Sequence, residues 1–321
     1  LAKKADVVML APASANVIGK IAGGIADDML TTTVMACRCR KIIAPAMNTN
    51  MFENPIVQDN LKKLEYYGYE VISPAVGYLA CGDTGAGKMP SEQVLLNYIL
   101  RTIAKDKDMT GIKLTVTAGP TREKLDPVRF LSNNSTGKMG YAIAKMAMLR
   151  GADVTLISGK VSLEPVPFVK MVDIVSAEDM YNAVIKSAKD ADIIIKAAAV
   201  ADYRPSDVSD EKIKKKDGDM SIPLERTKDI IGTLGSNKRD GLFLCGFSME
   251  TEHMLDNSKV KLTKKNLDMI VANNVKVAGA GFGTDTNVVT VITKDAVEEL
   301  PMMSKEEVAD ALLDRIMKAR Q

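Results

Sequence analysis

Histidine and cysteine are scarce in this chain. Of its 321 residues one is a histidine, His253, and four are cysteines. A single histidine excludes a histidine-rich metal site and argues against a Ser–His–Asp triad. Cys37 and Cys39 are one residue apart, a spacing that fits neither a zinc knuckle nor a redox Cys-x-x-Cys pair. Four cysteines are also too few for a disulfide framework, so we expect a reducing, cytoplasmic location.

Long apolar runs and a strong net charge are missing too. No signal peptide and no apolar segment of membrane length are present. Lys and Arg number 43 against 41 Asp and Glu, a net charge of +2, so no global field predicts a nucleic-acid or membrane partner. Because the first residue is Leu1 rather than Met, we expect the natural N-terminus to be missing.

Short apolar runs alternate with helical patterns, which predicts an α/β protein with parallel sheets. The charged segment 104–111 has no apolar face and separates two units, residues 1–108 and 109–321. Residues 77–88 read as a glycine-rich loop, and residues 163–168 as a proline-rich arm or edge. Expected strands cover residues 5–12, 41–45, 70–74, 113–118, 154–158, 192–198, 241–248, 267–273 and 288–292; expected helices cover residues 91–104, 138–150, 177–189, 259–266 and 304–318.

The stretch 111–140 has the order strand, polar loop, helix. The strand 113–118 is broken by Gly119-Pro120, and the loop closes on Ser-Asn-Asn-Ser-Thr-Gly-Lys before the helix starts near Met139. Backbone N–H groups and the positive end of a helix can hold a phosphate there. Neither GxGxxG nor a Walker loop is present. The spacing alone favours nucleotide binding only slightly over a plain surface loop.

Other polar residues have a functional and a plain interpretation. The lysine run 212–216 could clamp phosphates, although a solvated charge run is favoured. Asp202 follows a strand and could bind a hydroxyl or a metal, or cap a turn. Lys261 and Lys265 could bind the same phosphates, or they could lie on a solvent-exposed face of a helix. Asn48 could serve its own turn, and Cys81, among glycines, is as readily a reactive thiol as an inert one.

Several long motifs together carry a family resemblance over nearly the whole chain. They are Pro-Ala-Ser-Ala-Asn at 12–16, Pro-Ala-Met-Asn-Thr-Asn-Met at 45–51, Ala-Cys-Gly-Asp at 80–83, Ala-Gly-Pro-Thr-Arg-Glu at 118–123, Asp-Pro-Val-Arg-Phe-Leu-Ser-Asn at 126–133, Ser-Thr-Gly-Lys-Met-Gly at 135–140, Ala-Ala-Ala-Val-Ala-Asp at 197–202 and Lys-Ile-Lys-Lys at 212–215. The chain resembles the family in which phosphopantothenoylcysteine decarboxylase is fused to phosphopantothenate–cysteine ligase. The resemblance implies part of a flavodoxin-like domain followed by a Rossmann-like, doubly wound ligase domain.

For the second unit the resemblance implies CTP-dependent ligation of 4′-phosphopantothenate to cysteine through an acyl-cytidylate, assisted by Mg²⁺. It implies that Asn133 holds the acyl-cytidylate, that Arg129 lies in the same substrate motif, and that Lys212 serves the second step. It leaves the metal ligands unknown, and it implies a dimeric ligase. The implied CTP-binding residues are Asp202, Lys212, Lys228, Asp229, Ile230, Ile231, Phe247, Lys261 and Lys265.

For the first unit the resemblance implies an FMN-dependent decarboxylase that makes 4′-phosphopantetheine. Asn48 would bind the substrate carboxylate, Cys81 would act on the enethiol intermediate, and Ser14 and Asn16 would lie near the flavin. The FMN phosphate loop and catalytic histidine of the family would precede Leu1. We therefore keep open the alternative that the chain is a ligase only, with an inactive decarboxylase domain.

Two further hypotheses compete with this one. Two α/β units also suit an NAD(P)-linked oxidoreductase, although GxGxxG is absent. A non-catalytic, flavodoxin-like regulatory subunit is the other. The presence of the Asn133 and Lys212 motifs argues against it, because a protein that only binds has no need of them.

Overall fold

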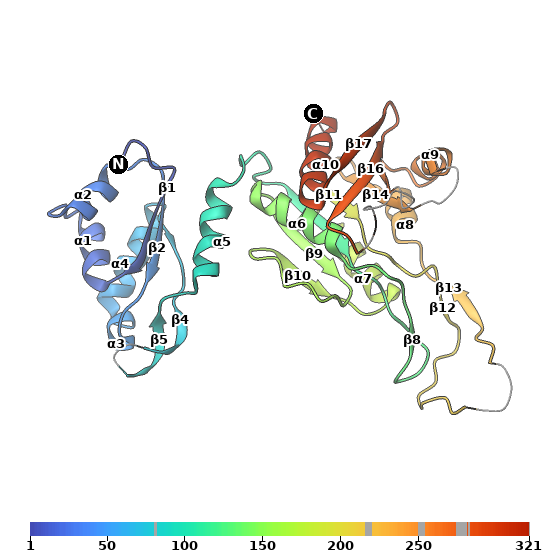
Figure 1. The fold of residues 1–321 in the computed structure, drawn as a ribbon, viewed down its shortest axis with the longest axis horizontal. Helices are drawn as coiled ribbons and strands as arrows, with labels where there is room; N and C mark the ends of the chain where they lie inside the picture. The colour runs from blue at the N-terminus through green and yellow to red at the C-terminus, as the bar shows by residue number, and fades with distance from the viewer. Residues whose placement is uncertain (80–81, 216–219, 250–253, 274–280, 282, 321) are drawn as a thin grey trace. The chain divides into compact units, whose positions relative to one another are not determined.

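The computed structural model describes residues 1–79, 82–215, 220–249, 254–273, 281 and 283–320. The chain divides into two compact units, Leu1–Asp106 and Lys107–Gln321. Figure 1 shows the course of the chain through both.

The first unit is built on a small parallel sheet with the strand order β1-β2-β3, as the alternating pattern predicts. Its strands are β1 (Val7–Ala13), β2 (Arg40–Pro45) and β3 (Glu70–Val71), and a separate hairpin pairs β4 (Ala75–Tyr78) with β5 (Thr84–Lys88). Its helices are α1 (Ala15–Gly23), α2 (Met29–Ala36), α3 (Thr49–Phe52), α4 (Pro55–Tyr66) and α5 (Glu92–Ile103).

Helices cover both faces of this sheet. On one face Ile18 of α1 and Leu61 of α4 pack against Leu10 and Ile43. On the other face Leu95 and Tyr98 of α5 pack on Ile42 and Ile72. Both faces of β2 are therefore apolar, which explains its uninterrupted Ile-Ile-Ala-Pro run.

The second unit holds an eight-stranded sheet in the order β10-β9-β6-β11-β14-β15-β16-β17. The strands are β6 (Lys113–Ala118), β9 (Asp153–Ser158), β10 (Lys170–Asp173), β11 (Ile193–Lys196), β14 (Phe243–Met249), β15 (Met269–Asn273), β16 (Thr286–Ile292) and β17 (Val297–Ser304). Two small hairpins pair β7 (Glu123–Lys124) with β8 (Phe130–Leu131) and β12 (Tyr203–Pro205) with β13 (Leu224–Arg226). The helices are α6 (Lys138–Leu149), α7 (Ala177–Ser187), α8 (Ile230–Ser236), α9 (Met254–Lys264) and α10 (Lys305–Ala319).

The strand order fixes where this sheet can bind a ligand. The six strands from β10 to β15 run parallel, and β16 and β17 run antiparallel to the strands beside them. From β6 the chain first moves outward through β9 to β10, and then returns to the other side of β6 at β11. The connections after β6 and β11 leave in opposite directions, so a crevice opens between their carboxyl ends.

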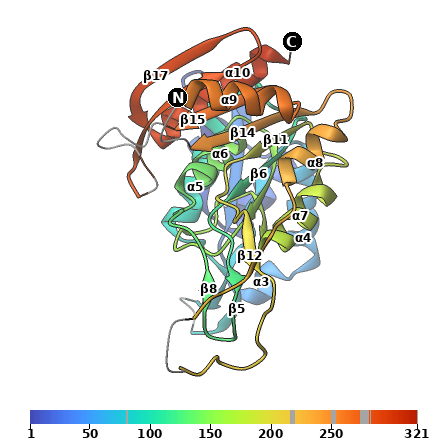
Figure 2. The same cartoon turned by 90° about the vertical axis from the view of Figure 1, so that its right-hand side faces the viewer.

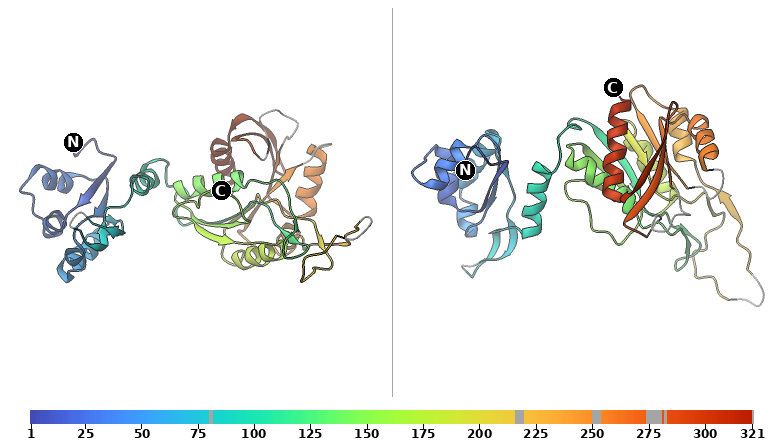
Figure 3. Two further views of the ribbon diagram at one scale, coloured as in Figure 1. Left: turned by 60° about the horizontal axis from the view of Figure 1, so that its bottom comes forward. Right: turned by 45° about the horizontal axis from the view of Figure 1, so that its top comes forward.

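The large sheet has two packed faces. Alternate strand residues such as Ile193 and Ile195 pack with α6 and α10, while Ile194 and Leu244 pack with α7, α8 and α9. Figures 2 and 3 show the helices on both sides of the sheet, and the hairpin β12–β13 with its long connection projecting beyond it. Strand alternation therefore decides on which face each residue at the carboxyl edge lies.

One expectation about local structure is wrong, one strand was missed, and one expected strand is shorter than predicted. The glycine-rich segment 77–88 forms much of the hairpin β4–β5 rather than a loop. Of the two alternatives for the proline-rich segment 163–168, the structure agrees with an arm and not with an edge strand; the sheet edge is β10, just after it. The segment 297–304 forms β17, which sequence patterns missed because Pro301 and its exposed acidic neighbours do not resemble a strand. The expected third strand of the first unit is only the two residues of β3.

Candidate active site

The crevice between β6 and β11 is closed at its base by backbone contacts. The Ala199 amide donates to Gly119 O at 3.0 Å, and the Thr121 amide donates to Ala199 O at 3.2 Å. Gly119 has φ 72°, a conformation that glycine adopts without strain. A Cβ on Gly159 would lie 1.9 Å from Pro120 O, so the next loop approaches as closely as a glycine permits. These contacts make a rigid floor for the polar residues above.

Asn133 lies directly on this floor. Its Nδ2 donates to Ala199 O at 3.0 Å, and Ser132 Oγ donates to Thr121 O at 2.8 Å. The side chain of Asn133 is thereby held beside the segment that leads from β11 to Asp202. The structure thus joins two motifs that are 66 residues apart in the chain.

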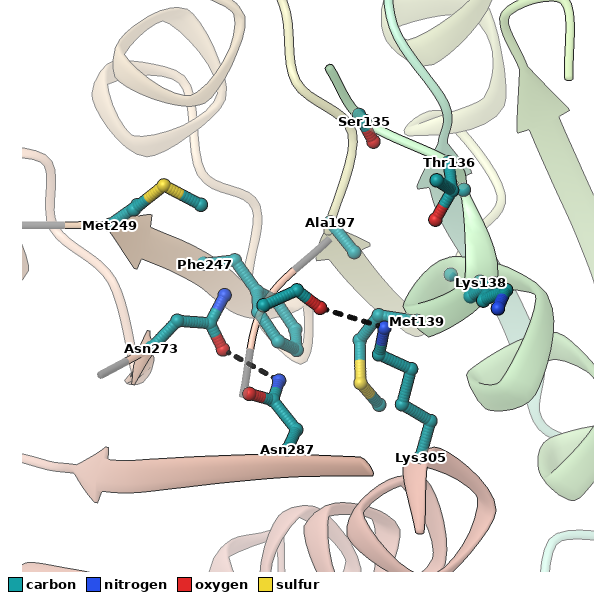
Figure 4. Close-up of a pocket in the computed structure, with 13 residues that line it drawn as sticks. Ser135, Thr136, Lys138, Met139, Ala197, Phe247, Met249, Asn273, Asn287 and Lys305 are labelled. Carbon is teal, nitrogen blue, oxygen red and sulfur yellow. Dashed lines mark hydrogen bonds between the residues drawn. The ribbon is translucent and has the colours of Figure 1, made fainter. Parts of the chain in front are cut away.

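The N-terminus of α6 forms a second part of the site. Gly137, the N-cap residue with φ 79°, gives the 12-residue helix no side-chain cap. Its first N–H groups and its dipole therefore remain available to an anion. Residues 135–140 line a small cavity together with the side chains of Phe247, Asn273, Asn287 and Lys305 (Figure 4).

Lysines hold the segment around Gly283 close to this cavity. Lys305, 6% exposed, donates to Gly281 O at 2.9 Å, and Lys138 donates to Gly283 O at 2.9 Å and pairs with Asp285 at 2.7 Å. Burial, with Lys138 nearby, lowers the pKa of Lys305. The enclosed space is about 40 Å³, enough for a few water molecules. In this arrangement a nucleotide does not fit inside it.

A charged cluster lies on the opposite face of the sheet. Asp229 caps α8 through the Gly232 amide at 3.1 Å and pairs with Lys265 at 3.0 Å. Burial alone would raise the pKa of Asp229, but these two contacts lower it. An open cavity of about 860 Å³ is lined by Asp229, Gly232, Thr233, Ser236, Asn237, Asn257, Val260, Lys261, Lys264 and Lys265. Its volume suits a nucleotide.

Sequence patterns missed Lys196 in this cluster. It ends the apolar strand β11 and lies on the same face as Ile194, toward α7, α8 and α9. Burial, followed by the charge of Lys265, lowers its pKa, while Asp229 and Asp202 act in the opposite sense. The sequence did contain a signal for Lys196. Lysine is rarely buried without a charged partner, so a lysine at the end of an Ile-Ile-Ile strand of a parallel sheet indicates such a partner or a ligand.

Arg129 and the lysine segment meet at Asp126. Asp126 is 2% exposed, and Arg129 Nε donates to its Oδ2 at 2.9 Å. The amide of Ile213, the residue after Lys212, donates to the same oxygen at 3.1 Å. Among the described residues, the structure gives Lys212 itself no side-chain contact with Asn133 or Asp202. It does attach the segment that carries Lys212 to the motif that carries Asn133.

The remaining predicted nucleotide residues do not share one cavity. Lys228 pairs with Glu178 at 2.7 Å, and Ile230 and Ile231 are core residues, 2% and 5% exposed. Phe247 faces α6, whereas Lys261 and Lys265 face the α8 side. Neither of the two cavities described above contains both groups. Only the carboxyl edge of the sheet, around Ala197 and Lys196, connects them.

In the first unit three predicted residues lie after β1 and β2. Ser14 caps α1 by accepting from the Val17 amide at 3.4 Å, and Asn16 lies in that first turn. Asn48 caps α3 and donates from Nδ2 to Asp83 Oδ2 at 3.1 Å. The hairpin β4–β5 therefore folds against the Asn48 loop. Cys81 lies outside the described residues.

None of the helices described is long and apolar enough to cross a membrane. Among the residues that the structure describes, no three His, Cys, Asp or Glu side chains are grouped so that they could hold a metal ion.

Comparison with known proteins identifies the family. Residues 109–319 match the DNA/pantothenate metabolism flavoprotein C-terminal domain, and residues 1–104 match the Flavoprotein family. The coenzyme A biosynthesis bifunctional protein CoaBC of Bacillus subtilis (strain 168) is 48% identical over 97% of this chain and 78% of its own length. The chain belongs to the CoaBC family.

Other CoaBC proteins support the same family assignment. The protein of Vibrio cholerae is 43% identical over 98% of this chain and 79% of its own length. The crystal structure of the C-terminal domain of a CoaBC protein shares 44% identity, covers 67% of this chain and 97% of that domain, and has a TM-score of 0.57. The predicted resemblance and the two-part α/β fold are confirmed. As a CoaBC protein the chain is an enzyme of coenzyme A biosynthesis with ligase and decarboxylase parts.

Proposed function

We propose that residues 109–321 join 4′-phosphopantothenate to cysteine with CTP, and that residues 1–108 belong to the FMN-dependent decarboxylase of the same pathway. One observation carries the first part. The Asn133 loop, the N-terminus of α6 and the segment from Lys196 to Asp202 converge at the crevice where the strand order reverses. Ligands of open α/β sheets bind at this position.

The ligation requires two steps. A carboxylate oxygen of phosphopantothenate attacks the α-phosphorus of CTP, and the bond to pyrophosphate breaks, which leaves an acyl-cytidylate. The cysteine amine then attacks the acyl carbon, the bond to CMP breaks, and an amide forms while the amine loses a proton. Because both reactants are anionic in the first step, the protein contributes mainly positioning and neutralisation of charge.

The residues of this chain suit those two tasks. The N-terminus of α6 would receive phosphate oxygens. Lys196, Lys261 and Lys265 supply positive charge at the α8 side of the same edge. Asn133 would hold the acyl-cytidylate through its amide, and Lys212 would act in the second step. Asp202, whose charge acts on Lys196, would bind the nucleotide.

Mg²⁺ is proposed to bind mainly through the nucleotide phosphates, where it would neutralise their charge. Asp229 and Asp202 are the carboxylates whose charges act on Lys196 at the proposed phosphate site. CTP rather than ATP is proposed from the resemblance to the fused bacterial proteins. A homodimer of the ligase unit is proposed on the same ground.

The first unit is proposed to bind FMN near Ser14 and Asn16, which lie at the carboxyl end of β1. The flavin would supply the oxidation that makes loss of CO₂ easy. Asn48 would hold the substrate carboxylate, and Cys81 is proposed to act on the product side.

Pyrophosphate release tests the ligase. With CTP, Mg²⁺, phosphopantothenate and cysteine, we expect continuous release of pyrophosphate and formation of the amide, and little release when phosphopantothenate is left out. Lys212→Gln should release about one equivalent of pyrophosphate and then stop, whereas Lys294→Gln on an exposed turn should behave as the wild type. Continuous turnover by Lys212→Gln would remove the role given to Lys212. A flavin absorbance spectrum of the purified chain tests the FMN assignment.

A further inference from the structure

Asp126 receives five hydrogen bonds. Its Oδ1 accepts from the amides of Val128 and Arg129, both at 2.8 Å. Its Oδ2 accepts from Arg129 Nε at 2.9 Å, from Arg129 Nη2 at 2.5 Å and from the amide of Ile213 at 3.1 Å. The side chain of Asp126 has no exposed surface. A buried carboxylate that is bonded so completely is a structural anchor.

Asp126 and Arg129 together bind the backbone of Ile213, which lies in the connection from β12 to β13, through both its N–H and its C=O group. While Asp126 accepts from the Ile213 N–H, Arg129 Nη2 donates to Ile213 O at 2.7 Å. The Ser209 amide adds a bond to Leu125 O at 3.1 Å. Within the described residues 210–215, Ile213 alone has a hydrogen bond to a segment outside the connection from β12 to β13. Lys212 and Lys214 flank Ile213 on either side.

Asp126 and Asn133 belong to the same loop. The loop turns through β7 and β8, and its Ser132 and Asn133 are fixed to Thr121 and Ala199. Any segment that docks on Asp126 is therefore held at a set distance from the Asn133 amide. The arm that carries Lys212 is otherwise a long connection that projects from the sheet (Figure 3), and a free connection would rarely place its lysine over the crevice.

We propose that Asp126 and Arg129 are positioning residues that dock the lysine arm at Ile213, so that Lys212 reaches the acyl-nucleotide bound at Asn133. The inference rests on the proposed function. It gives Arg129 a role through Ile213, in place of direct substrate binding. Loss of the dock should impair the second step, which needs Lys212, far more than the first.

Two half-reactions separate these effects. Pyrophosphate release without cysteine reports the first step, and amide formation after addition of cysteine reports the second. For Asp126→Asn we expect the first step to stay within about threefold of the wild type, and the second to fall on the order of 100-fold, as expected for a group misplaced by about 1 Å. Asp179→Asn changes another carboxylate of this unit, which accepts from the Ser176 amide and hydroxyl; it is the control and should leave both steps unchanged.

A second pair of variants leaves the buried loop intact. Ile213→Pro removes the N–H from which Asp126 accepts and also fixes φ at position 213, whereas Ile213→Ala keeps the N–H. We expect amide formation to fall about tenfold or more in the proline variant relative to the alanine variant. Trypsin should cleave after Lys214 faster in Asp126→Asn and Ile213→Pro than in Ile213→Ala. Cleavage after Lys212 is compared only between Asp126→Asn and Ile213→Ala, because trypsin does not cut a bond that precedes proline. This readout does not depend on any substrate.

Coupling to Lys212 distinguishes positioning from general loss of stability. In the double variant Asp126→Asn/Lys212→Gln the second step should be no slower than in Lys212→Gln alone, because without the lysine the dock has nothing to place. Multiplicative effects, equal losses in both half-reactions, or unchanged tryptic cleavage would each overturn the proposal. If the wild type forms no amide from CTP, phosphopantothenate and cysteine, the proposed function fails together with the catalytic role of the dock, whatever the cleavage pattern.

Discussion

Burial of the Lys196 amine disfavours its charged form, and the same charge is available to bind a phosphate. Lys196 ends the strand between β6 and β14, and burial lowers its pKa against the ordinary value of a lysine. Three lysines at positions 196, 261 and 265 face two carboxylates, Asp202 and Asp229. The cluster therefore carries an excess of positive charge in a partly desolvated place, and a phosphate would relieve it.

Removing this charge should weaken nucleotide binding. For Lys196→Met we expect the KM for CTP to rise about tenfold or more, with a smaller change in kcat, since a charged hydrogen bond to phosphate is lost. Steady-state kinetics of pyrophosphate release at varied CTP give the measurement. Lys294→Met, on the turn between β16 and β17, is the control. An unchanged KM in Lys196→Met would place the phosphates elsewhere.

The lowered pKa also predicts a pH dependence. As the pH rises, Lys196 loses its proton earlier than an ordinary lysine, and the neutral amine attracts phosphate less. Affinity for CTP should thus be complete at pH values below the pKa of Lys196 and fall as the pH rises through it. Lys196→Arg, which stays charged, should abolish this fall. A rise in KM of equal size in both proteins would assign the titration to another group.

At the level of secondary structure, the packing of α6 on β6 decides whether the phosphate-binding end of the helix is aimed at the crevice. Gly140 makes the close approach possible. A Cβ at that position would lie 2.6 Å from Ala118 Cβ and 2.8 Å from Thr117 O. The helix therefore rests on the last residues of the strand, and its N-terminus lies beside Gly119.

Gly140→Ala should push the helix away from the strand. We expect a loss of about 1–3 kcal/mol in the free energy of unfolding and a lower rate of pyrophosphate release. Gly19→Ala is the matched control, because Gly19 also lies inside a helix and a Cβ there would meet only Asn60 Nδ2 at 3.8 Å. That variant should be neutral or gain up to about 1 kcal/mol. Chemical denaturation of the two variants tests the difference.

The chain as a whole consists of two units, and the second begins before its first strand. Met109 is 0% exposed and belongs to the core of the large sheet. Lys107 donates to Leu149 O at 2.5 Å, and Asp108 pairs with Arg150, which also contacts Asp314 at 2.7 Å. The residues that connect the units are thus part of the second one.

Fragments with different starting points should reveal this. We expect residues 107–321 to retain the ligase activity. A fragment 113–321 lacks the buried Met109 and should lose about 2–5 kcal/mol, which lowers Tm by roughly 5–15 °C. A fragment 109–321, which begins at the predicted domain border, should lie between the two, since it keeps Met109 but not Asp108. Equal Tm values for all three would show that the connecting residues do not stabilise the unit.

Elements with strong periodicity were predicted well. Strand β6 was predicted at its observed limits, and α10 within one residue at each end. Helix caps such as Ser91 and Ser304 mark the starts that the sequence indicates. The hairpin β4–β5 was missed because Gly77, Gly85 and Gly87 interrupt the strand pattern. Its pairing depends on the close approach of Gly87 to Met47, which no local pattern reveals.

The candidate site was predicted in its parts more than in its arrangement. The motifs predicted Asn133, Arg129 and Lys212 as site residues. They did not predict that Asp126 connects Arg129 with the lysine segment through Ile213. Those bonds join residues 84 and 87 positions apart, and sequence spacing holds no information about such a contact. Lys196 was missed because the apolar pattern predicts the buried residues of the strand and says nothing about the role of the lysine that ends it.

Local chemistry therefore determined the strands, the helix starts, the two α/β units and the family from the order of residues alone, because periodicity, caps and motifs are properties of neighbouring residues. The three-dimensional packing decided the rest. It chose which face of the sheet Lys196 and Phe247 occupy, brought Asn133 onto Ala199, and fastened the lysine arm at Ile213. Contacts between distant segments arise only when hydrophobic burial has already set the sheet order, so the chain had to fold before they existed.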